Sequence, residues 1–194
     1  MPHPFPKSSY TAQLKAFIAG HHELMQILQA LREIEAQAYL AAGVIRNSIW
    51  AQLHEQAYPL HQTEIDVVYF DALDDGTAEQ QIREKLETAF PDMLWDVVNQ
   101  ARVHHWYRMD NGNSIAPFSS LAQALAMWPE TATAVAVQLD ASGQLKIIAP
   151  LGLQDLFELK LRWNPAMASY AVFQRRLNDK AFLTRWPELQ LISS

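Results

Sequence analysis

The sequence of 194 residues contains no cysteine. This absence excludes disulfide bonds, thiolate catalysis and any zinc site built on cysteine, and it is compatible with any compartment. No apolar run approaches the ~18 residues that a membrane-spanning helix needs. Residues 1–6 include three prolines and lack the basic and then apolar pattern of a signal peptide. We therefore expect a cytoplasmic protein with no membrane partner.

Basic residues are in the minority, since 15 Lys and Arg stand against 21 Asp and Glu and the formal net charge is -6. This balance argues against a protein that coats nucleic acid with a large basic face. The stretch from residue 160 onward is different, because its basic residues clearly outnumber its acidic ones. Such a stretch is typical of a solvated helix face, and the alternative is a surface that faces phosphates.

Helical and strand patterns alternate along the first half of the chain, and a β-hairpin pattern follows. Helices are expected over 9–19, 20–37, 44–56, 77–90, 119–127 and 166–185, and strands over 39–42, 65–70, 94–98, 133–139, 145–148 and 159–163. This order predicts a single α+β domain over 1–194 in which a mixed β-sheet is packed with helices. We divide it into N-terminal helices at 9–38, a core at 39–165 and a C-terminal helical extension at 166–194.

Two acidic residues open the clearest predicted strand, which runs from Glu64 to Phe70. Side chains alternate along a strand, so Glu64 and Asp66 share one face and lie roughly 7 Å apart. Asp66 precedes an unbroken apolar run, where a charge is costly unless it is paired, hydrogen-bonded or bound to a metal. The two carboxylates can converge on one Mg²⁺ ion whose shell substrate phosphates complete. The alternative is a solvent-exposed start of a strand.

A glycine turn lies upstream, between the strand at 39–42 and the helix at 44–56. Gly43 allows the backbone to approach a phosphate closely, and the free amides at a helix start attract anions. Arg46 lies in the first helical turn and can bind phosphate oxygens through two parallel hydrogen bonds. The alternative is a glycine that serves only tight packing of the strand against the helix.

The glycine turn, the arginine three residues later and the acidic strand together resemble the nucleotidyltransferase fold of the DNA polymerase beta superfold. The arrangement is similar to that of enzymes that add CCA to transfer RNA. More specifically, residues 39–189 resemble an uncharacterised bacterial family of nucleotidyltransferase-like proteins. The matching stretches are 41–47, 64–71, 99–104, 128–134, 149–153, 155–157 and 164–165.

The chain departs from better-known relatives at three positions. It has Ala42 before Gly43 where those relatives carry Gly-Gly or Gly-Ser, Asn47 where CCA-adding enzymes have aspartate, and Glu64 where the first metal-binding acid is commonly aspartate. Glutamate can still bind a metal. The resemblance further implies a third carboxylate from a neighbouring strand, and Asp96 is the best candidate because it lies in the next predicted strand. Asp71 and Asp155 remain open as alternatives.

The segment that follows this strand offers polar and aromatic groups. Asn99 and Arg102 would share a helix face at three-residue spacing, where they could bind a base, a sugar or a phosphate. Trp106 and Tyr107 offer stacking surfaces, although aromatic residues in such a helix more often belong to the core.

Together these features predict a metal-dependent nucleotidyltransferase, with Mg²⁺ or Mn²⁺ as cofactor. It would move a nucleoside monophosphate from a nucleoside triphosphate to a hydroxyl acceptor and release pyrophosphate. The net charge favours a small-molecule or protein acceptor, and the basic C-terminal stretch keeps transfer RNA possible. The alternatives are a catalytically silent nucleotide-binding or protein-interaction module on the same fold, and a phosphate-handling protein of unrelated fold. The expected metal-binding and catalytic residues are Glu64, Asp66 and Asp96, and the expected nucleotide-binding residues are Gly43, Arg46, Asn47, Asn99 and Arg102.

Overall fold

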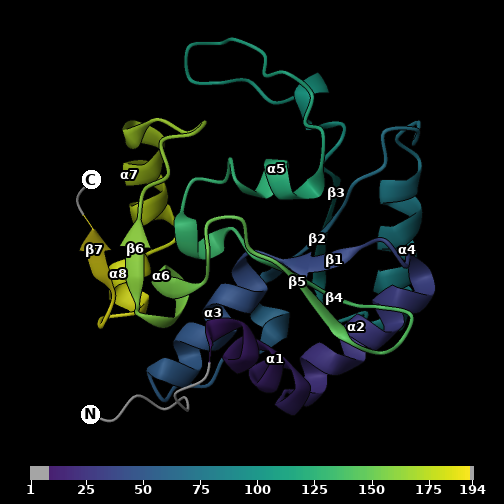
Figure 1. The fold of residues 1–194 in the computed structure, drawn as a ribbon, viewed down its shortest axis with the longest axis horizontal. Coiled ribbons are helices and arrows are strands. Elements are labelled where there is room, and N and C mark those ends of the chain that lie inside the picture. The colour runs from purple at the N-terminus through teal and green to yellow at the C-terminus, as the bar shows by residue number, and fades with distance from the viewer. Residues whose placement is uncertain (1–8, 193–194) are drawn as a thin grey trace.

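A computed structural model describes residues 9–192 and shows a five-stranded sheet surrounded by helices (Figure 1). The strand order is β3-β2-β1-β4-β5. β2 and β3 are parallel, whereas β1 is antiparallel to both β2 and β4, and β4 is antiparallel to β5. The predicted α+β class with a mixed sheet is thereby confirmed. The strands are β1 (Tyr39–Ala41), β2 (Glu64–Tyr69), β3 (Leu94–Asn99), β4 (Ala136–Leu139) and β5 (Leu145–Ile148).

The helices begin and end close to the predicted boundaries in the first half of the chain. Ser9 caps the first helix by accepting the Ala12 N–H, as the preference for serine at this position predicts. Residues 60–62, 103–105 and 131–133 form single 3-10 turns. The α-helices are α1 (Tyr10–Gly20), α2 (His22–Ile34), α3 (Gly43–Leu53), α4 (Ala78–Ala89), α5 (Leu121–Leu125), α6 (Gln154–Phe157), α7 (Tyr170–Asp179) and α8 (Phe182–Arg185).

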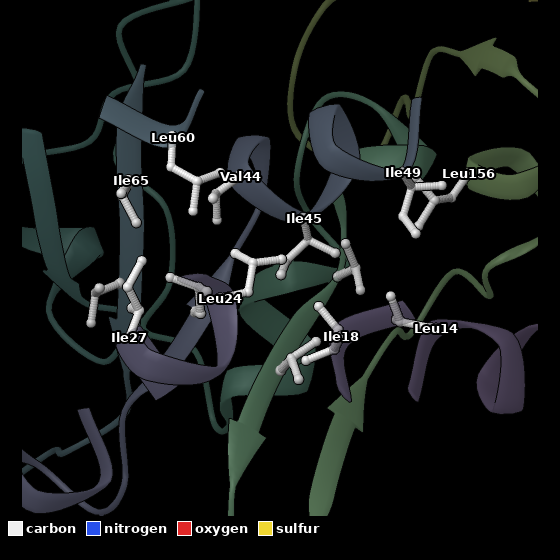
Figure 2. Packing of buried hydrophobic residues seen from close by; sticks show 14 of the residues in the cluster. Leu14, Ile18, Leu24, Ile27, Val44, Ile45, Ile49, Leu60, Ile65 and Leu156 are labelled. Atoms are coloured by element: carbon white, nitrogen blue, oxygen red, sulfur yellow. The ribbon is translucent and has the colours of Figure 1, made fainter. Parts of the chain in front are cut away.

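The two faces of the sheet have different roles. Ile65 and Val67 of β2 belong to the main core. Figure 2 shows Ile65 among apolar side chains of α1, α2 and α3. Val68 points to the opposite face and packs with Leu121 and Leu125 of the short helix α5. Because strand side chains alternate, the acidic residues of β2 lie on this second face.

The C-terminal part differs from the prediction of one helix over 166–185. The helix breaks between α7 and α8 because Ala181 adopts a left-handed backbone conformation with φ of 49°. The chain then forms β7 (Gln190–Ile192), which pairs in parallel with β6 (Lys160–Arg162) in a separate two-stranded sheet. The pairing of β7 had no counterpart in the predicted elements.

Ala42, at the turn between β1 and α3, carries backbone strain. Its φ of 53° and ψ of -122° lie in a region that suits glycine. Such strain costs about 1–3 kcal/mol of stability. Glycine removes the strain, but its greater conformational freedom in the unfolded chain lowers stability by about 0.4–1 kcal/mol. Ala42→Gly should therefore raise the free energy of unfolding by about 1 kcal/mol.

Urea unfolding of the parent and the variant measures this effect. Ala16→Gly on the exposed face of α1 is the matched control, and it should lower stability by about 1 kcal/mol. Equal losses at both positions would show that the backbone at Ala42 is not strained.

Candidate active site

The register of β2 and β3 brings two of the predicted acidic residues together. Asp66 and Asp96 are direct partners in this parallel pair, so their side chains project from the same face of the sheet. Neighbouring strands lie ~4.8 Å apart, which places the two carboxylates side by side. Glu64 lies two residues before Asp66, and all three residues line one cavity.

The carboxylate of Asp66 is partly buried. Its Oδ2 accepts a hydrogen bond from the Gly43 N–H at the start of α3, at 3.3 Å. Burial, together with the nearby charges of Asp96 and Glu64, raises the pKa of Asp66 to about 6, against the lowering effects of the Gly43 amide and Arg46. A positive charge placed here would relieve this unfavourable concentration of negative charge.

Gly43 opens α3 directly beside this carboxylate. A Cβ atom at position 43 would lie 3.5 Å from Asp66 Oδ2 and 3.8 Å from the Arg46 guanidinium. A Cβ atom would therefore touch both groups and fill the space between them. Glycine leaves this space open at the start of the helix.

Arg46 lies in the wall of the cavity and is 5% exposed. Its Nη1 donates to Thr133 Oγ1 at 2.6 Å, and its Nε and Nη2 donate to Asn47 Oδ1 at 3.2 and 3.0 Å. The guanidinium also lies 4.6 Å from the centre of the Phe182 ring. Burial lowers the pKa of Arg46 to about 10, so it remains a cation at neutral pH.

Glu130 connects this arginine to a second one. The Glu130 side chain is fully buried and accepts hydrogen bonds from Nε and Nη2 of Arg176 on α7, at 2.5 and 3.1 Å. Glu130 Oε2 also accepts the Thr133 hydroxyl at 3.1 Å. Because Thr133 also accepts a hydrogen bond from Arg46, the buried Glu130 carboxylate holds Arg176 directly and Arg46 through Thr133. Although burial lowers the pKa of Arg176, the hydrogen bond and charge of Glu130 raise it more, so Arg176 remains charged.

A first cavity of about 340 Å³ contains the acidic residues together with cations, and we call it the cationic cavity. Lys180 follows α7 and Arg185 ends α8, and both line it. The break at Ala181 separates Lys180 from α8, and the two side chains line the same cavity. The basic C-terminal stretch thus forms part of the wall of the cavity that contains the acidic residues. The cations that line the cationic cavity are Arg46, Arg176, Lys180 and Arg185.

A second cavity of about 330 Å³ adjoins the first, and we call it the aromatic cavity. It shares Asp66, Asp96 and Arg176 with the cationic cavity. Trp106 and Tyr107 line it, with Phe118, Trp128 and Met167 also on its walls. Trp106 is 60% exposed, so its interpretation as a core residue is wrong.

Comparisons with known proteins identify the family and the fold of the chain. A family model described as Nucleotidyltransferase matches residues 31–191. The chain belongs to this nucleotidyltransferase family. The match also confirms the resemblance that the sequence motifs indicated. A sequence comparison with curated proteins gives no match.

Solved structures show the same fold for this family member. One protein, whose NMR structure is described as revealing a CCA-adding enzyme head domain, is 26% identical with a TM-score of 0.79, over 94% of this chain and 96% of the other. A Thermotoga maritima CCA-adding enzyme complexed with transfer RNA is 13% identical with a TM-score of 0.61, over 93% of this chain. A CCA-adding enzyme in complex with CTP is 14% identical with a TM-score of 0.59, over 96% of this chain. The chain spans 42% and 44% of these two enzymes.

Two residues predicted to bind the nucleotide lie elsewhere in this nucleotidyltransferase. The helix expected from Asn99 onward is wrong, because Asn99 ends β3 and Arg102 lies in the turn that follows. Asn99 is fully buried, and its side chain bonds the backbone of Asp71 and the carboxylate of Asp74. Arg102 Nη1 donates to the Asp74 carbonyl at 2.8 Å. Both residues hold the loop after β2 in place.

The alternatives for the third carboxylate also lie outside the two cavities. Asp71 Oδ1 accepts the Leu73 N–H in the loop after β2. Asp155 accepts the Thr131 hydroxyl at 2.7 Å and Arg162 Nε at 2.8 Å. Asp96 is the candidate that lines the same cavity as Asp66.

The sequence patterns missed Glu130 and Thr133 as site residues, and assigned Arg176 only to a positive stretch. The available signal for Glu130 was a single charge among small and apolar residues at 128–136, in a stretch that matched the family. An acid in such a run requires a buried partner.

Carboxylates are the hard oxygen ligands that Mg²⁺ prefers, usually with one or two from the protein and the rest from substrate and water. Within residues 9–192, no three Asp, Glu, His or Cys side chains are gathered tightly enough to hold an ion by themselves. Asp66 and Asp96 supply two carboxylates, which falls within the number of protein ligands that Mg²⁺ usually binds when substrate and water complete its shell. Over the same residues, no helix has the length and apolar content to span a bilayer.

Proposed function

We propose that this chain transfers a nucleoside monophosphate from a nucleoside triphosphate to a hydroxyl acceptor, with pyrophosphate as the leaving group. The observation that carries the proposal is the register pairing of Asp66 with Asp96 at a cavity that four cations also line. Acidic residues for a metal and cations for a polyphosphate are the two charge elements that this reaction requires.

The cations have separate roles in this proposal. Lys180 is exposed at the cavity, so its ammonium is free to approach the outer phosphates. Arg176 presents its guanidinium to both cavities, held there by Glu130. Arg46 is buried and bonded to Thr133 and Asn47, so it contributes positive charge from the wall. The open helix start at Gly43 gives a phosphate access to backbone amides.

The residues present fit a divalent cation. The raised pKa of Asp66, to about 6, shows that its negative charge is poorly compensated by the protein alone. Asp66 and Asp96 are the residues that would hold Mg²⁺ or Mn²⁺, with Glu64 as a third acidic residue on the wall of the same cavity. When bound, such an ion neutralises charge on the phosphoryl group that is transferred. The protein groups position the nucleotide and exclude competing orientations.

A screen of the four nucleoside triphosphates with Mg²⁺ or Mn²⁺ tests the proposal. Calorimetry should detect metal-dependent binding of at least one nucleotide, and a pyrophosphate assay should detect its turnover when an acceptor is present. Nucleotide binding without any pyrophosphate release over a broad acceptor set would instead support a catalytically silent nucleotide-binding module.

Lys180→Ala should weaken binding of that nucleotide about tenfold, because one charged hydrogen bond to phosphate is lost. Lys180 is exposed, so the fold should be unaffected. Lys15→Ala on the exposed face of α1 is the matched control and should leave the affinity unchanged. Equal affinities for the parent and Lys180→Ala would remove the cationic cavity as the phosphate site.

A further inference from the structure

The cationic and aromatic cavities meet at Asp66 and Asp96. In the proposed reaction, pyrophosphate departs with several negative charges, so it belongs on the side of Lys180 and Arg185. The attacking and leaving oxygens of a phosphoryl transfer lie roughly in line on opposite sides of phosphorus. The attacking hydroxyl must therefore approach from the aromatic cavity.

We propose that the aromatic cavity binds the acceptor, and that this acceptor is a small uncharged alcohol carrying a flat ring. The inference rests on the proposed function and names the substrate class of that same site. A volume of about 330 Å³ has the size of a small-molecule site. Trp106 and Tyr107 lie edge to face with ring centres 6.2 Å apart, and both line the cavity. The exposed Trp106 ring offers a stacking surface at the cavity wall.

The charges around the aromatic cavity favour an uncharged ligand. Within residues 9–192, Arg176 is the one cationic side chain that lines it, and the buried carboxylate of Glu130 already pairs with that arginine. The carboxylates of Asp66 and Asp96 also line it, and they offer no partner to a phosphate. A phosphate-bearing acceptor, including the end of an RNA strand, would find no free cationic side chain here to compensate its charge.

The reaction step follows from this placement. The acceptor hydroxyl oxygen forms a bond to the α-phosphorus, and the bond from the α-phosphorus to the oxygen that bridges it to the β-phosphorus breaks. Pyrophosphate leaves with that electron pair into the cationic cavity. The hydroxyl proton passes to the carboxylate of Asp96, which lines both cavities. The products are a phosphodiester of the acceptor and pyrophosphate.

Three matched probes test the ligand class by saturation-transfer NMR. Naphthylmethanol carries a flat ring and a hydroxyl, its decahydro counterpart has similar bulk without a flat ring, and naphthylmethyl phosphate adds a charge. Only naphthylmethanol should bind well to the parent, and Trp106→Ala should weaken its binding about tenfold. Trp106→Phe should restore most of the binding because it retains a ring. Leu73→Ala, at a side chain 96% exposed in the loop after β2, is the control that should change nothing.

Calorimetry with nucleoside triphosphate and Mg²⁺ on the same variants separates this inference from the proposed function. Unchanged nucleotide affinity in Trp106→Ala together with the loss of naphthylmethanol binding supports the aromatic cavity as the acceptor site. A nucleotide affinity that falls tenfold in Trp106→Ala would show that the cavity binds the base instead. Stronger binding of the phosphate probe, or labelling of an RNA that Trp106→Ala leaves unaffected, would also overturn the inference. If the parent binds no nucleotide at all, the proposed function itself fails.

Discussion

Asp66→Asn is expected to abolish metal-dependent nucleotide binding and at the same time to stabilise the fold. Asparagine keeps an oxygen that can accept the Gly43 N–H, but it removes the negative charge that a divalent cation requires. The same charge is unfavourable in the free protein, since burial and the neighbouring Asp96 and Glu64 raise the pKa of Asp66 from 3.8 to about 6. Removing it should raise the free energy of unfolding at pH 7 by about 2–3 kcal/mol.

The pH dependence gives this prediction a specific form. A carboxyl whose pKa is higher in the folded protein than in the unfolded chain destabilises the fold once the pH exceeds the unfolded value. The stabilisation by Asp66→Asn should therefore be complete above about pH 6 and vanish below about pH 4. Urea unfolding across this range measures it, with the exposed Asp92→Asn as a control that shows no such change. A variant that binds nucleotide and Mg²⁺ as well as the parent would refute the site assignment.

Glu130→Gln is expected to cost about 3–5 kcal/mol of stability. The fully buried Glu130 carboxylate accepts hydrogen bonds from Arg176 and from the Thr133 hydroxyl. The Thr133 hydroxyl oxygen in turn accepts a hydrogen bond from Arg46. A neutral amide leaves Arg176 without its counter-charge at a pair whose acidic member is fully buried, and breaking an ion pair is most costly where a partner is buried. Nucleotide affinity should fall as well, because both arginines lose the group that holds them at the cavity.

Urea unfolding gives the stability, and calorimetry gives the affinity of the folded variant. Glu158→Gln makes the same chemical change at a partly exposed ion pair with Lys160, and it should cost less than about 1 kcal/mol. Equal effects of the two substitutions would mean that Glu130 does not organise the site.

The part of the site that the sequence predicted depends on local patterns. Alternation along β2 placed Glu64 and Asp66 on one face, and an apolar flank singled out Asp96 in the next strand. The placement of Glu64 and Asp66 needed only the two-residue period of a strand and the cost of a charge beside an apolar run, whereas the choice of Asp96 also needed the third carboxylate that the family resemblance implies. The glycine before a helix was likewise visible because Gly43 interrupts two clear patterns.

The rest depends on contacts between distant segments, which local patterns do not encode. Glu130 and Arg176 are 46 residues apart, and nothing in either segment names the other as its partner. Asn99 looked like a helix residue because its neighbours share helical spacing, but parallel pairing with β2 extended the strand through it. The break at Ala181 was equally hidden, since alanine ordinarily favours the helix interior.

The segment between β3 and α5, residues 100–120, contributes Trp106, Tyr107 and Phe118 to the aromatic cavity but no strand to the main sheet (Figure 1). Asp66 and Asp96, by contrast, are fixed by strand pairing. Insertions or substitutions in this segment could alter which molecules enter without disturbing the acidic pair. For the proposed reaction, this arrangement would allow acceptor selectivity to diversify among homologues, or under laboratory selection, while the reaction chemistry stays the same.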